Sequence, residues 1–221
     1  MTAPLSPPLA PLLTSPATER NKHPILEALQ AVLGPQGTAL EIASGTGQHA
    51  VWFAAALKDW IWQPTDADPH LLPVISRRIA QSGLSRVRAP VQLDVMSPDW
   101  PNTEAPFTET FDTIFCANML HISPAATTTA LMQGAARHLK PGGLLITYGP
   151  YFDEAPAPPS NLAFDADLRA RNPAWGIRHL NDVVQAAERA GLALRERRQM
   201  PANNLLLVFR TPAVPEPRGL G

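Results

Sequence analysis

The stretch that decides the fold is LEIASGTGQHA, residues 40–50, in which an apolar run breaks into glycines and then opens a helix-like run. A glycine turn between a strand and a helix presents backbone N–H groups and usually suits phosphate. Here an acid, Glu41, stands four residues before the first glycine, Gly45. A carboxylate at this place disfavours an anionic ligand. The ligand of the turn therefore has to be inferred from its surroundings.

Strand-like and helix-like segments alternate on both sides of this stretch. We expect strands near 38–43, 60–66, 86–95, 111–118 and 144–149. We expect helices near 23–34, 47–59, 69–83, 123–143, 162–172 and 179–190, with Pro24 in the first turn of one and Ser123 as the N-cap of another. Such alternation predicts an α/β domain with a parallel sheet and helices on both faces.

The C-terminal end departs from this alternation. Residues 192–200 and 203–210 read as strands joined by a connection too short for a crossover helix, so they must form an antiparallel hairpin. We predict a Rossmann-like, seven-stranded, mostly parallel sheet with an antiparallel strand from that hairpin. The predicted organisation is a proline-rich extension (1–16), one domain (17–211) with a substrate-side loop or lid (151–180), and a flexible tail (212–221).

Composition narrows the classes of function. The 221 residues are 45% hydrophobic and 17% charged, with a net charge of −1 and no basic stripe, which argues against a nucleic-acid binder. The single cysteine, Cys116, excludes an internal disulfide and fits a reducing compartment. No apolar run is long enough to span a membrane, and the N-terminus lacks the pattern of a signal peptide. We expect a cytoplasmic protein without membrane partners.

Acids follow several of the predicted strands. Asp66 ends the second strand and Asp94 the third, and the carboxyl ends of parallel strands form the ligand crevice of such a sheet. The turn also matches G-x-G-x-x-A, with Asp66 lying 21 residues after Gly45, as in sites that bind NAD. A pyrophosphate near Glu41 and Asp94 would meet repulsion on the order of 4 kcal/mol per contact at 4 Å and an effective dielectric of about 20. These charges favour a cationic ligand without phosphate, such as S-adenosylmethionine.

Several motifs carry a family resemblance. EIASGTG (41–47), FDTIFCANMLHIS (111–123) and HLKPGGLLITYGP (138–150) resemble motifs of the class I S-adenosylmethionine-dependent methyltransferase superfamily. ATERNKHPILEAL (17–29), EIASGTGQHAVWFA (41–54), WQPTD (62–66) and RNPAWGIRHLNDV (171–183) resemble the methyltransferase-like 26 family. The resemblance runs from about residue 16 to 210. Ala43 departs from the superfamily, in which glycine is common at that place.

The resemblance implies the class I methyltransferase fold and a set of cofactor-binding residues. These are Asn21, Glu41, Ala43, Ser44, Gly45, Gln48, His49, Asp66, Asp94, Val95, Asn118 and Met119. Asp66 is expected to accept from both ribose hydroxyls, Asp94 from the adenine amino group, and Asn118 to hold the amino acid part. Glu41 either orders the turn or reaches the ammonium group through water. His49 lies in an apolar helix, which favours a packing or capping role for it over a catalytic one.

The acceptor side is predicted less directly. His121 and Tyr151 are the expected catalytic residues, His121 as a base that titrates near neutral pH. The expected substrate residues are Arg20, Tyr151, Arg171, Asn172, Trp175 and Arg178. No D/N-P-P-Y/F motif and no metal-ligand spacing are present, which favours a small-molecule acceptor.

The predicted reaction is in-line methyl transfer that leaves S-adenosylhomocysteine. Two alternatives remain open: a non-catalytic S-adenosylmethionine-binding or scaffold module, and an NAD-dependent oxidoreductase.

Overall fold

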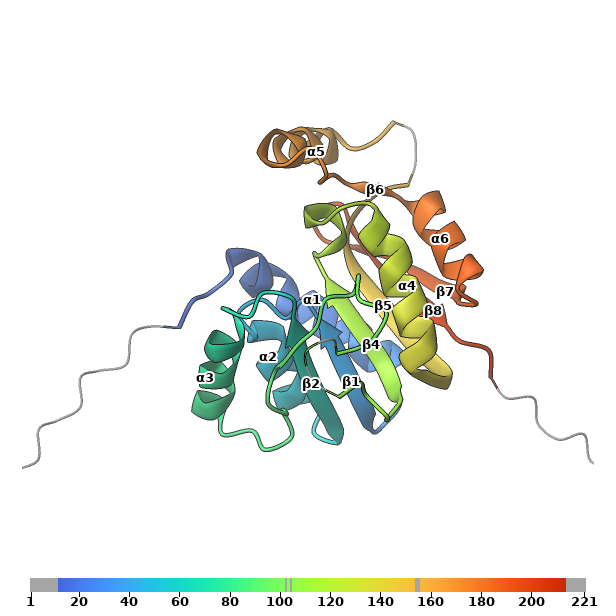
Figure 1. Cartoon of the computed structure of the whole chain (residues 1–221). Helices are drawn as coiled ribbons and strands as arrows, with labels where there is room; N and C mark the ends of the chain where they lie inside the picture. Colours follow the sequence, from blue (N-terminus) through green and yellow to red (C-terminus); the bar gives the residue numbers. More distant parts are fainter. Residues whose placement is uncertain (1–11, 102, 104, 154–155, 214–221) are drawn as a thin grey trace, which may run out of the picture.

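The computed structural model describes residues 12–101, 103, 105–153 and 156–213 (Figure 1). The strands are β1 (Gly37–Ile42), β2 (Trp60–Asp66), β3 (Val91–Gln92), β4 (Phe111–Ala117), β5 (Leu139–Phe152), β6 (Arg178–His179), β7 (Ala193–Met200) and β8 (Asn204–Arg210). They form one sheet in the order β3-β2-β1-β4-β5-β8-β7, with β6 paired to β5. Only β8 runs antiparallel to its neighbours β5 and β7. The predicted fold class is confirmed, with the short β6 as an added eighth strand.

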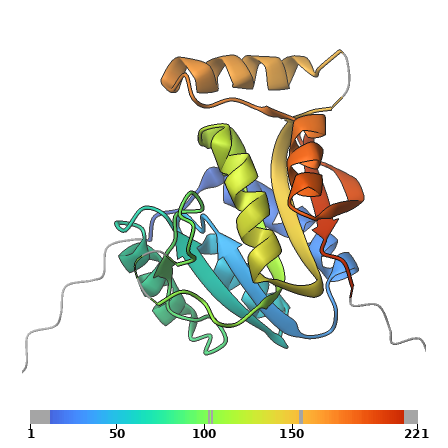
Figure 2. The same ribbon diagram turned by 45° about the vertical axis from the view of Figure 1, so that its right-hand side comes forward.

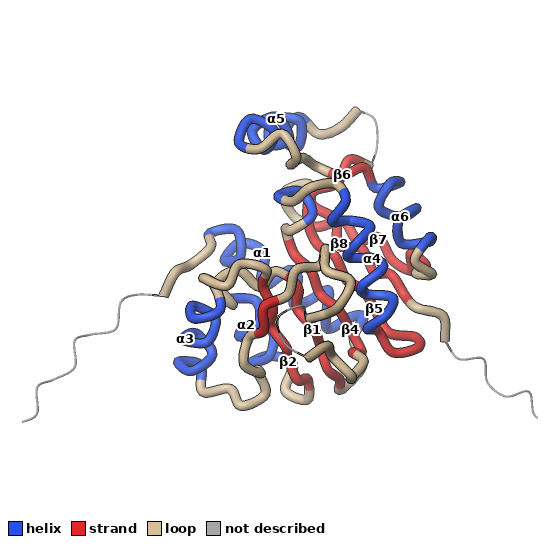
Figure 3. The backbone as a smooth tube through the Cα atoms, in the orientation of Figure 1, coloured by secondary structure: helices blue, strands red, loops and turns tan. Residues whose placement is uncertain are grey.

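Helices cover both faces of this sheet (Figure 3). They are α1 (Pro16–Val32), α2 (Gln48–Ala56), α3 (Leu72–Ser82), α4 (Ala126–His138), α5 (Pro159–Arg171) and α6 (Leu180–Arg189), with a 3-10 turn η1 (Leu120–Ile122) before α4. Residues of α1 and α2 share one hydrophobic core with the sheet, and residues of α4 and α6 share the other. Helix α5 lies apart from both layers, across the end of the sheet (Figure 2).

The central strand β4 shows why the sheet is buried on both faces. Successive strand residues point to opposite sides. Accordingly Phe115 packs in the core with α1 and α2, whereas Ile114 and Cys116 pack in the core with α4 and α6. All three side chains are buried, which explains the continuous apolar run in the sequence.

Two helix starts differ from the sequence prediction. Helix α1 begins at Pro16 instead of near residue 23, because Ser15 caps it: the Thr18 N–H donates to Ser15 Oγ at 3.4 Å. Pro24 therefore lies inside the helix. Ser123 is not the N-cap of α4: it follows directly after η1 as its C-cap, and α4 begins at Ala126 with Ala125 as the N-cap.

Two strands also differ in length. Strand β3 spans two residues instead of the predicted ten, and Pro90, which lacks an N–H to donate, stands immediately before it. Strand β5 runs to Phe152, beyond the predicted end at residue 149.

The N-terminal extension and the C-terminal tail fall mostly outside the described residues, since 1–11 and 214–221 are not described. In the part of the chain that is described, no helix is long and apolar enough to cross a membrane.

Candidate functional site

A cavity of about 1130 Å³ opens where β1, β2, β4 and β5 end. One small-molecule site typically occupies roughly 300–1,000 Å³, so this cavity is large enough for a nucleoside-sized ligand and a second molecule. The predicted site residues that line it are Arg20, Asn21, Ala43, Ser44, Gly45, His49, Asp66, Asp94, Val95, Asn118, Met119 and His121. The other predicted residues lie elsewhere, as described below.

Asp66 is bound to the glycine turn. Its Oδ2 accepts the Gly45 N–H at 2.8 Å and its Oδ1 accepts the Asp68 N–H at 3.0 Å. Burial raises the pKa of this carboxyl group, and backbone hydrogen bonds from Asp68, Gly45 and Ala67 oppose that rise. An ionised carboxylate has about four acceptor sites, so acceptor capacity remains for a hydroxyl donor in the cavity.

The turns after β1 and β4 are strained. Ala43 and Asn118 follow these strands with φ of 56° and 60°, in the left-handed region that non-glycine residues rarely adopt. Such strain concentrates at functional sites, where the surrounding structure holds it. For Asn118 the backbone N–H donates to the Tyr148 carbonyl oxygen at 2.8 Å, which fixes the turn at the cavity.

Glu41 does not line the cavity. Its side chain is buried beneath the turn, where its Oε2 accepts from Trp62 Nε1 at 2.5 Å. Burial, reinforced by the charge of Asp66, raises the pKa of Glu41 to about 8, although the hydrogen bond from Trp62 opposes this. The carboxyl group is thus protonated at neutral pH and can order the turn. The acidic character of the cavity comes from Asp66 and Asp94, which corrects the electrostatic argument made from Glu41.

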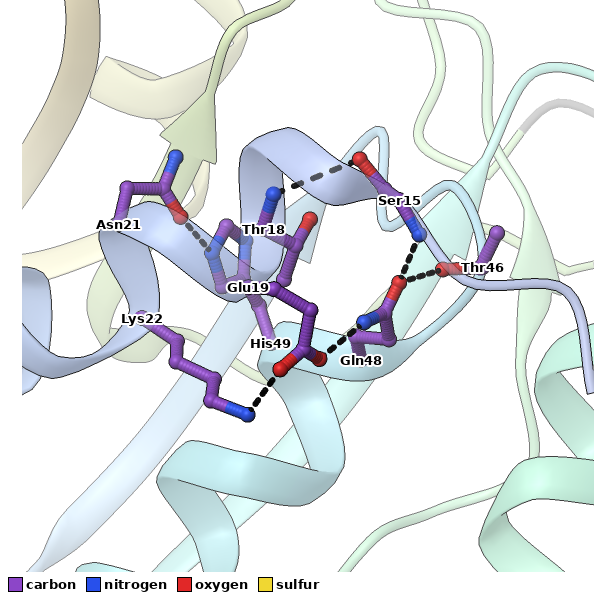
Figure 4. A network of polar contacts seen from close by, with 8 residues as sticks. All are labelled: Ser15, Thr18, Glu19, Asn21, Lys22, Thr46, Gln48 and His49. Carbon is purple, nitrogen blue, oxygen red and sulfur yellow. Dashed lines mark hydrogen bonds and ion pairs between the residues drawn. The ribbon is translucent and has the colours of Figure 1, made fainter.

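The first turns of α1 are fastened to the start of α2 (Figure 4). Gln48 Oε1 accepts from the Ser15 N–H and, at 2.9 Å, from Thr46 Oγ1. Gln48 Nε2 donates to Glu19 Oε1 at 2.6 Å. Gln48 lies outside the cavity lining, so it acts on the cavity by holding α1.

A second link lies one turn further along α1. His49 Nε2 donates to Asn21 Oδ1 at 2.8 Å, and the His49 ring stacks on Phe53 with centroids 5.0 Å apart. Burial lowers the pKa of His49 to about 4, so the imidazole is neutral. We call the residues of these two links, Ser15, Glu19, Asn21, Gln48 and His49, the α1 clasp.

His121 lies in η1, the short turn that follows β4. Its ring is 7% exposed, lines the cavity and contacts the Phe164 ring edge-to-face with centroids 5.4 Å apart. Burial, with the nearby charges of Arg178 and Arg171, lowers the pKa of His121 to about 4. The prediction that it titrates near neutral pH is therefore wrong. A neutral imidazole there accepts a hydrogen bond and is a weak base.

Tyr151 is enclosed in the core with α4 and α6. It is 4% exposed, and its hydroxyl group donates to Thr147 Oγ1 at 2.8 Å. It does not line the cavity, whereas Tyr148 of the same strand does. Residues three apart on a strand point to opposite faces, which explains the difference. We therefore leave Tyr151 out of the site.

The predicted substrate residues between 171 and 178 also lie away from the cavity lining. Arg171 pairs with Asp167 at 3.2 Å and lies over the Trp175 ring at 5.6 Å. Arg178 donates to the Ser123 carbonyl oxygen. Asn172 Oδ1 accepts the Ala174 N–H at 3.0 Å, so its side chain shapes the loop. These residues support the segment that follows α5 and do not face a ligand in the cavity.

Other lining residues escaped the sequence analysis. They include Tyr148, Thr127, Asn161, Phe164 and Asn204. Tyr148 could have been found as a residue at the end of β5. Asn161 and Phe164 come from α5, which carries no motif that points to a cavity. Among the described residues, no cluster of His, Cys, Asp or Glu could hold a metal ion.

Comparison with known proteins identifies a family and a fold. The model of a family described as "Protein of unknown function (DUF938)" matches residues 13–211. An O-methyltransferase family protein from Burkholderia thailandensis is similar in structure, with a TM-score of 0.73, 19% identity, and coverage of 89% of this chain and 58% of that chain. Human N-acetylserotonin methyltransferase, solved in complex with SAM, gives a TM-score of 0.73 at 14% identity, with coverage of 89% and 53%. The chain thus spans little more than half the length of these structures and shares their Rossmann-like methyltransferase fold.

Proposed function

The chain belongs to the family described as "Protein of unknown function (DUF938)", and from the geometry of its cavity we propose that it is an S-adenosylmethionine-dependent methyltransferase that acts on a small-molecule acceptor. The observation that carries the proposal is the large cavity at the strand ends. Its lining includes Asp66, Asp94 and Val95 from β2 and the segment after β3, and Asn118 and His121 from the segment after β4.

The residues present fit this cofactor. Asp66 keeps acceptor capacity for the two ribose hydroxyls, and Asp94 with the Val95 backbone would bind the adenine edge. The strained turns at Ala43 and Asn118 bring backbone close to the methionine part. Cationic character in the cofactor suits a cavity lined by two carboxyl groups.

The α1 clasp closes the same region. Because Ser15, Arg20 and Asn21 line the cavity, the clasp makes the first turns of α1 into one of its walls. In this proposal Arg20 binds the carboxylate of the cofactor. The wall excludes water from the methionine part, which strengthens each polar contact there.

S-adenosylmethionine, when bound, supplies an electrophilic methyl group on a sulfonium centre. In this proposal the chain contributes mainly alignment, and we assign Asn118 and His121, which line the cavity, to the side from which the acceptor approaches. Transfer of this methyl group to a lone pair of the acceptor would leave S-adenosylhomocysteine as the second product. Because the pKa of His121 is about 4, we assign it the role of accepting a hydrogen bond from the acceptor, whose proton passes to water.

Two finer inferences accompany this proposal. The motifs in 17–29 and 171–183 relate the chain to the methyltransferase-like 26 family. The single buried Cys116 fits a reducing, cytoplasmic compartment, which imaging of a fluorescently tagged chain would test.

Calorimetric titration with S-adenosylhomocysteine and with NAD tests the proposal, followed by transfer of a labelled methyl group to a metabolite panel. We expect S-adenosylhomocysteine to bind at one site per chain, NAD not to bind, and label to appear in a product. Binding of NAD alone would contradict the proposal. Binding of S-adenosylhomocysteine without label transfer to any acceptor would favour the non-catalytic module.

A further inference from the structure

One face of α5 closes the cavity on the acceptor side. Asn161 and Phe164 are three residues apart, so they lie on the same helix face, and both line the cavity. Figure 2 shows this helix crossing the end of the sheet. Asn161 is 4% exposed, whereas Phe164 is 37% exposed although it is a large apolar side chain. A ligand in the cavity would cover this apolar surface.

The facing wall is also apolar. Ile122 of η1 lines the cavity with 44% of its surface exposed, and Pro124 and Pro150 line it nearby. Phe164 meets the His121 ring edge-to-face at 5.4 Å, so an aromatic pair bounds this part of the cavity. Flat apolar molecules pack favourably against such pairs. We call Ile122, His121, Asn161 and Phe164 the α5 subsite.

Two polar atoms of this subsite are acceptors without a partner. Asn161 Nδ2 donates to the Asn203 carbonyl oxygen at 3.2 Å, and Asn161 Oδ1 has no hydrogen-bond partner among the described residues. The His121 ring nitrogens likewise have none among those residues. In a neutral imidazole one of these nitrogens accepts a hydrogen bond and the other carries the N–H donor. A ligand with an O–H or N–H donor would satisfy the two acceptors.

Charged side chains are absent from this end of the cavity lining. Among the described residues, η1, α5 and the β7–β8 turn contribute no Lys, Arg, Asp or Glu to it. Arg171 and Arg178 act on His121 electrostatically from outside the lining, where Arg171 pairs with Asp167 and Arg178 donates to the Ser123 carbonyl oxygen. An anionic or cationic ligand would therefore be desolvated here without a direct ion partner in the lining, which is unfavourable.

Arg20 is the one cation among the described lining residues. It belongs to α1, next to Asn21 of the clasp, and its charge acts on the Tyr148 hydroxyl. Among the described lining residues, this arginine is the one that could pair directly with a carboxylate on the acceptor. The experiment below therefore includes a carboxylate probe.

We propose that the α5 subsite selects an uncharged acceptor with a flat apolar body and one hydrogen-bond donor, accepted by His121 or Asn161. This proposal rests on the proposed function, because the donor group is the one that receives the methyl group.

The test uses the full chain saturated with S-adenosylhomocysteine and two matched probe sets. One set is 4-ethylphenol, 4-hydroxyphenylacetate and tyramine. The other is 2-naphthol, 6-hydroxy-2-naphthoate and 6-(aminomethyl)-2-naphthol. Ligand-observed NMR titration gives each Kd. We expect a neutral probe to bind at least tenfold more tightly than both charged members of its set. Equal or tighter binding of a charged member, or no binding of either neutral probe, overturns the proposal.

Two variants locate the binding. Phe164→Ala should weaken binding of the neutral probe at least fivefold. Leu162→Ala is the matched control, since Leu162 is 53% exposed on the same helix and does not line the cavity, and it should leave the Kd within twofold. Equal effects of the two variants overturn the proposal. Melting curves of both variants verify that each is folded.

The outcomes separate the two proposals. Failure of S-adenosylhomocysteine to bind the wild-type chain contradicts the proposed function and this inference with it. Normal binding of S-adenosylhomocysteine without preference for neutral probes contradicts this inference alone.

Discussion

Helices α1 and α5 both border the cavity, but they are held in opposite ways. Helix α1 buries Ile25, Ala28 and Leu29 in a core and is tied to the glycine turn by the α1 clasp. Helix α5 buries only Asn161 and Leu168, and its ion pairs lie within the helix. The wall that we propose for the cofactor is therefore built into the fold, whereas the wall that we propose for the acceptor is a lightly packed cover. Such a cover can adapt to an acceptor without disturbing the cofactor wall.

The largest expected effect concerns stability on the cofactor side. The pKa of Glu41 is raised to about 8 in the folded chain from about 4.5. The native state thus binds more protons than the unfolded state, and the free energy of unfolding falls as pH rises from about 4.5 to 8, by up to about 1.4 kcal/mol per pH unit. Glu41→Gln keeps an acceptor for Trp62 but removes this loss.

Urea unfolding of wild type and Glu41→Gln at pH 5, 6.5 and 8 measures this pH-dependent loss of stability. The difference between the two chains isolates Glu41, because His49 and His121 titrate in both. We expect the free energy of unfolding of the variant to increase relative to that of wild type as pH rises. A difference that is independent of pH would show that Glu41 is not buried in protonated form.

The next effect concerns cofactor affinity. Asp66→Ala removes acceptors for the ribose hydroxyls, each worth roughly 1–3 kcal/mol, and should weaken binding of S-adenosylhomocysteine about 10- to 100-fold. Asp68→Ala is the matched control, since Asp68 lies two residues away and does not line the cavity. Calorimetric titration measures the affinity of each variant for S-adenosylhomocysteine. Equal affinities in both variants would refute the assignment of Asp66.

Gln48→Leu breaks the first link of the α1 clasp without changing a residue of the cavity lining. We expect amide hydrogen exchange to speed up over 15–22, and affinity for S-adenosylhomocysteine to fall about fivefold, because an ordered wall must form on binding. Exchange in α5 should not change. Gln185→Leu is the control variant, since Gln185 is an exposed residue of α6. Faster exchange in both helices would mean that α1 and α5 are not independent walls.

The smallest effect is expected for Arg171→Ala. The exposed pair with Asp167 contributes roughly 0–1 kcal/mol, and Arg171 does not line the cavity. Thermal unfolding and the Kd values of S-adenosylhomocysteine and the neutral probes should stay close to wild type. A marked loss of probe affinity would restore this arginine to the acceptor site.

The strands and the cofactor side could be predicted from the sequence because they depend on local rules. β2 ends at Asp66 as expected, and the parallel-strand rule brings Asp66, Asp94 and Asn118 to one cavity. The acceptor side depends on tertiary facts. Tyr151 seemed to lie in a loop, but β5 continues past it and turns it into the core. Burial, which the sequence does not reveal, lowers the pKa of His121.

The start of α1 was missed for a different reason. Pro24 resembles a first-turn residue, and the actual cap, Ser15, stands in a proline-rich stretch that seemed unstructured. Ser15 and Gln48 are 33 residues apart in sequence, so no local pattern predicts the hydrogen bond between them.

A crystal structure of the chain with S-adenosylhomocysteine tests the central claim most directly. The account predicts the ribose at Asp66, the adenine beside Asp94 and Val95, and the sulfur directed toward Asn118 and the α5 subsite. Density for the ligand outside this cavity, or with its adenine against His121 and Phe164, would contradict it.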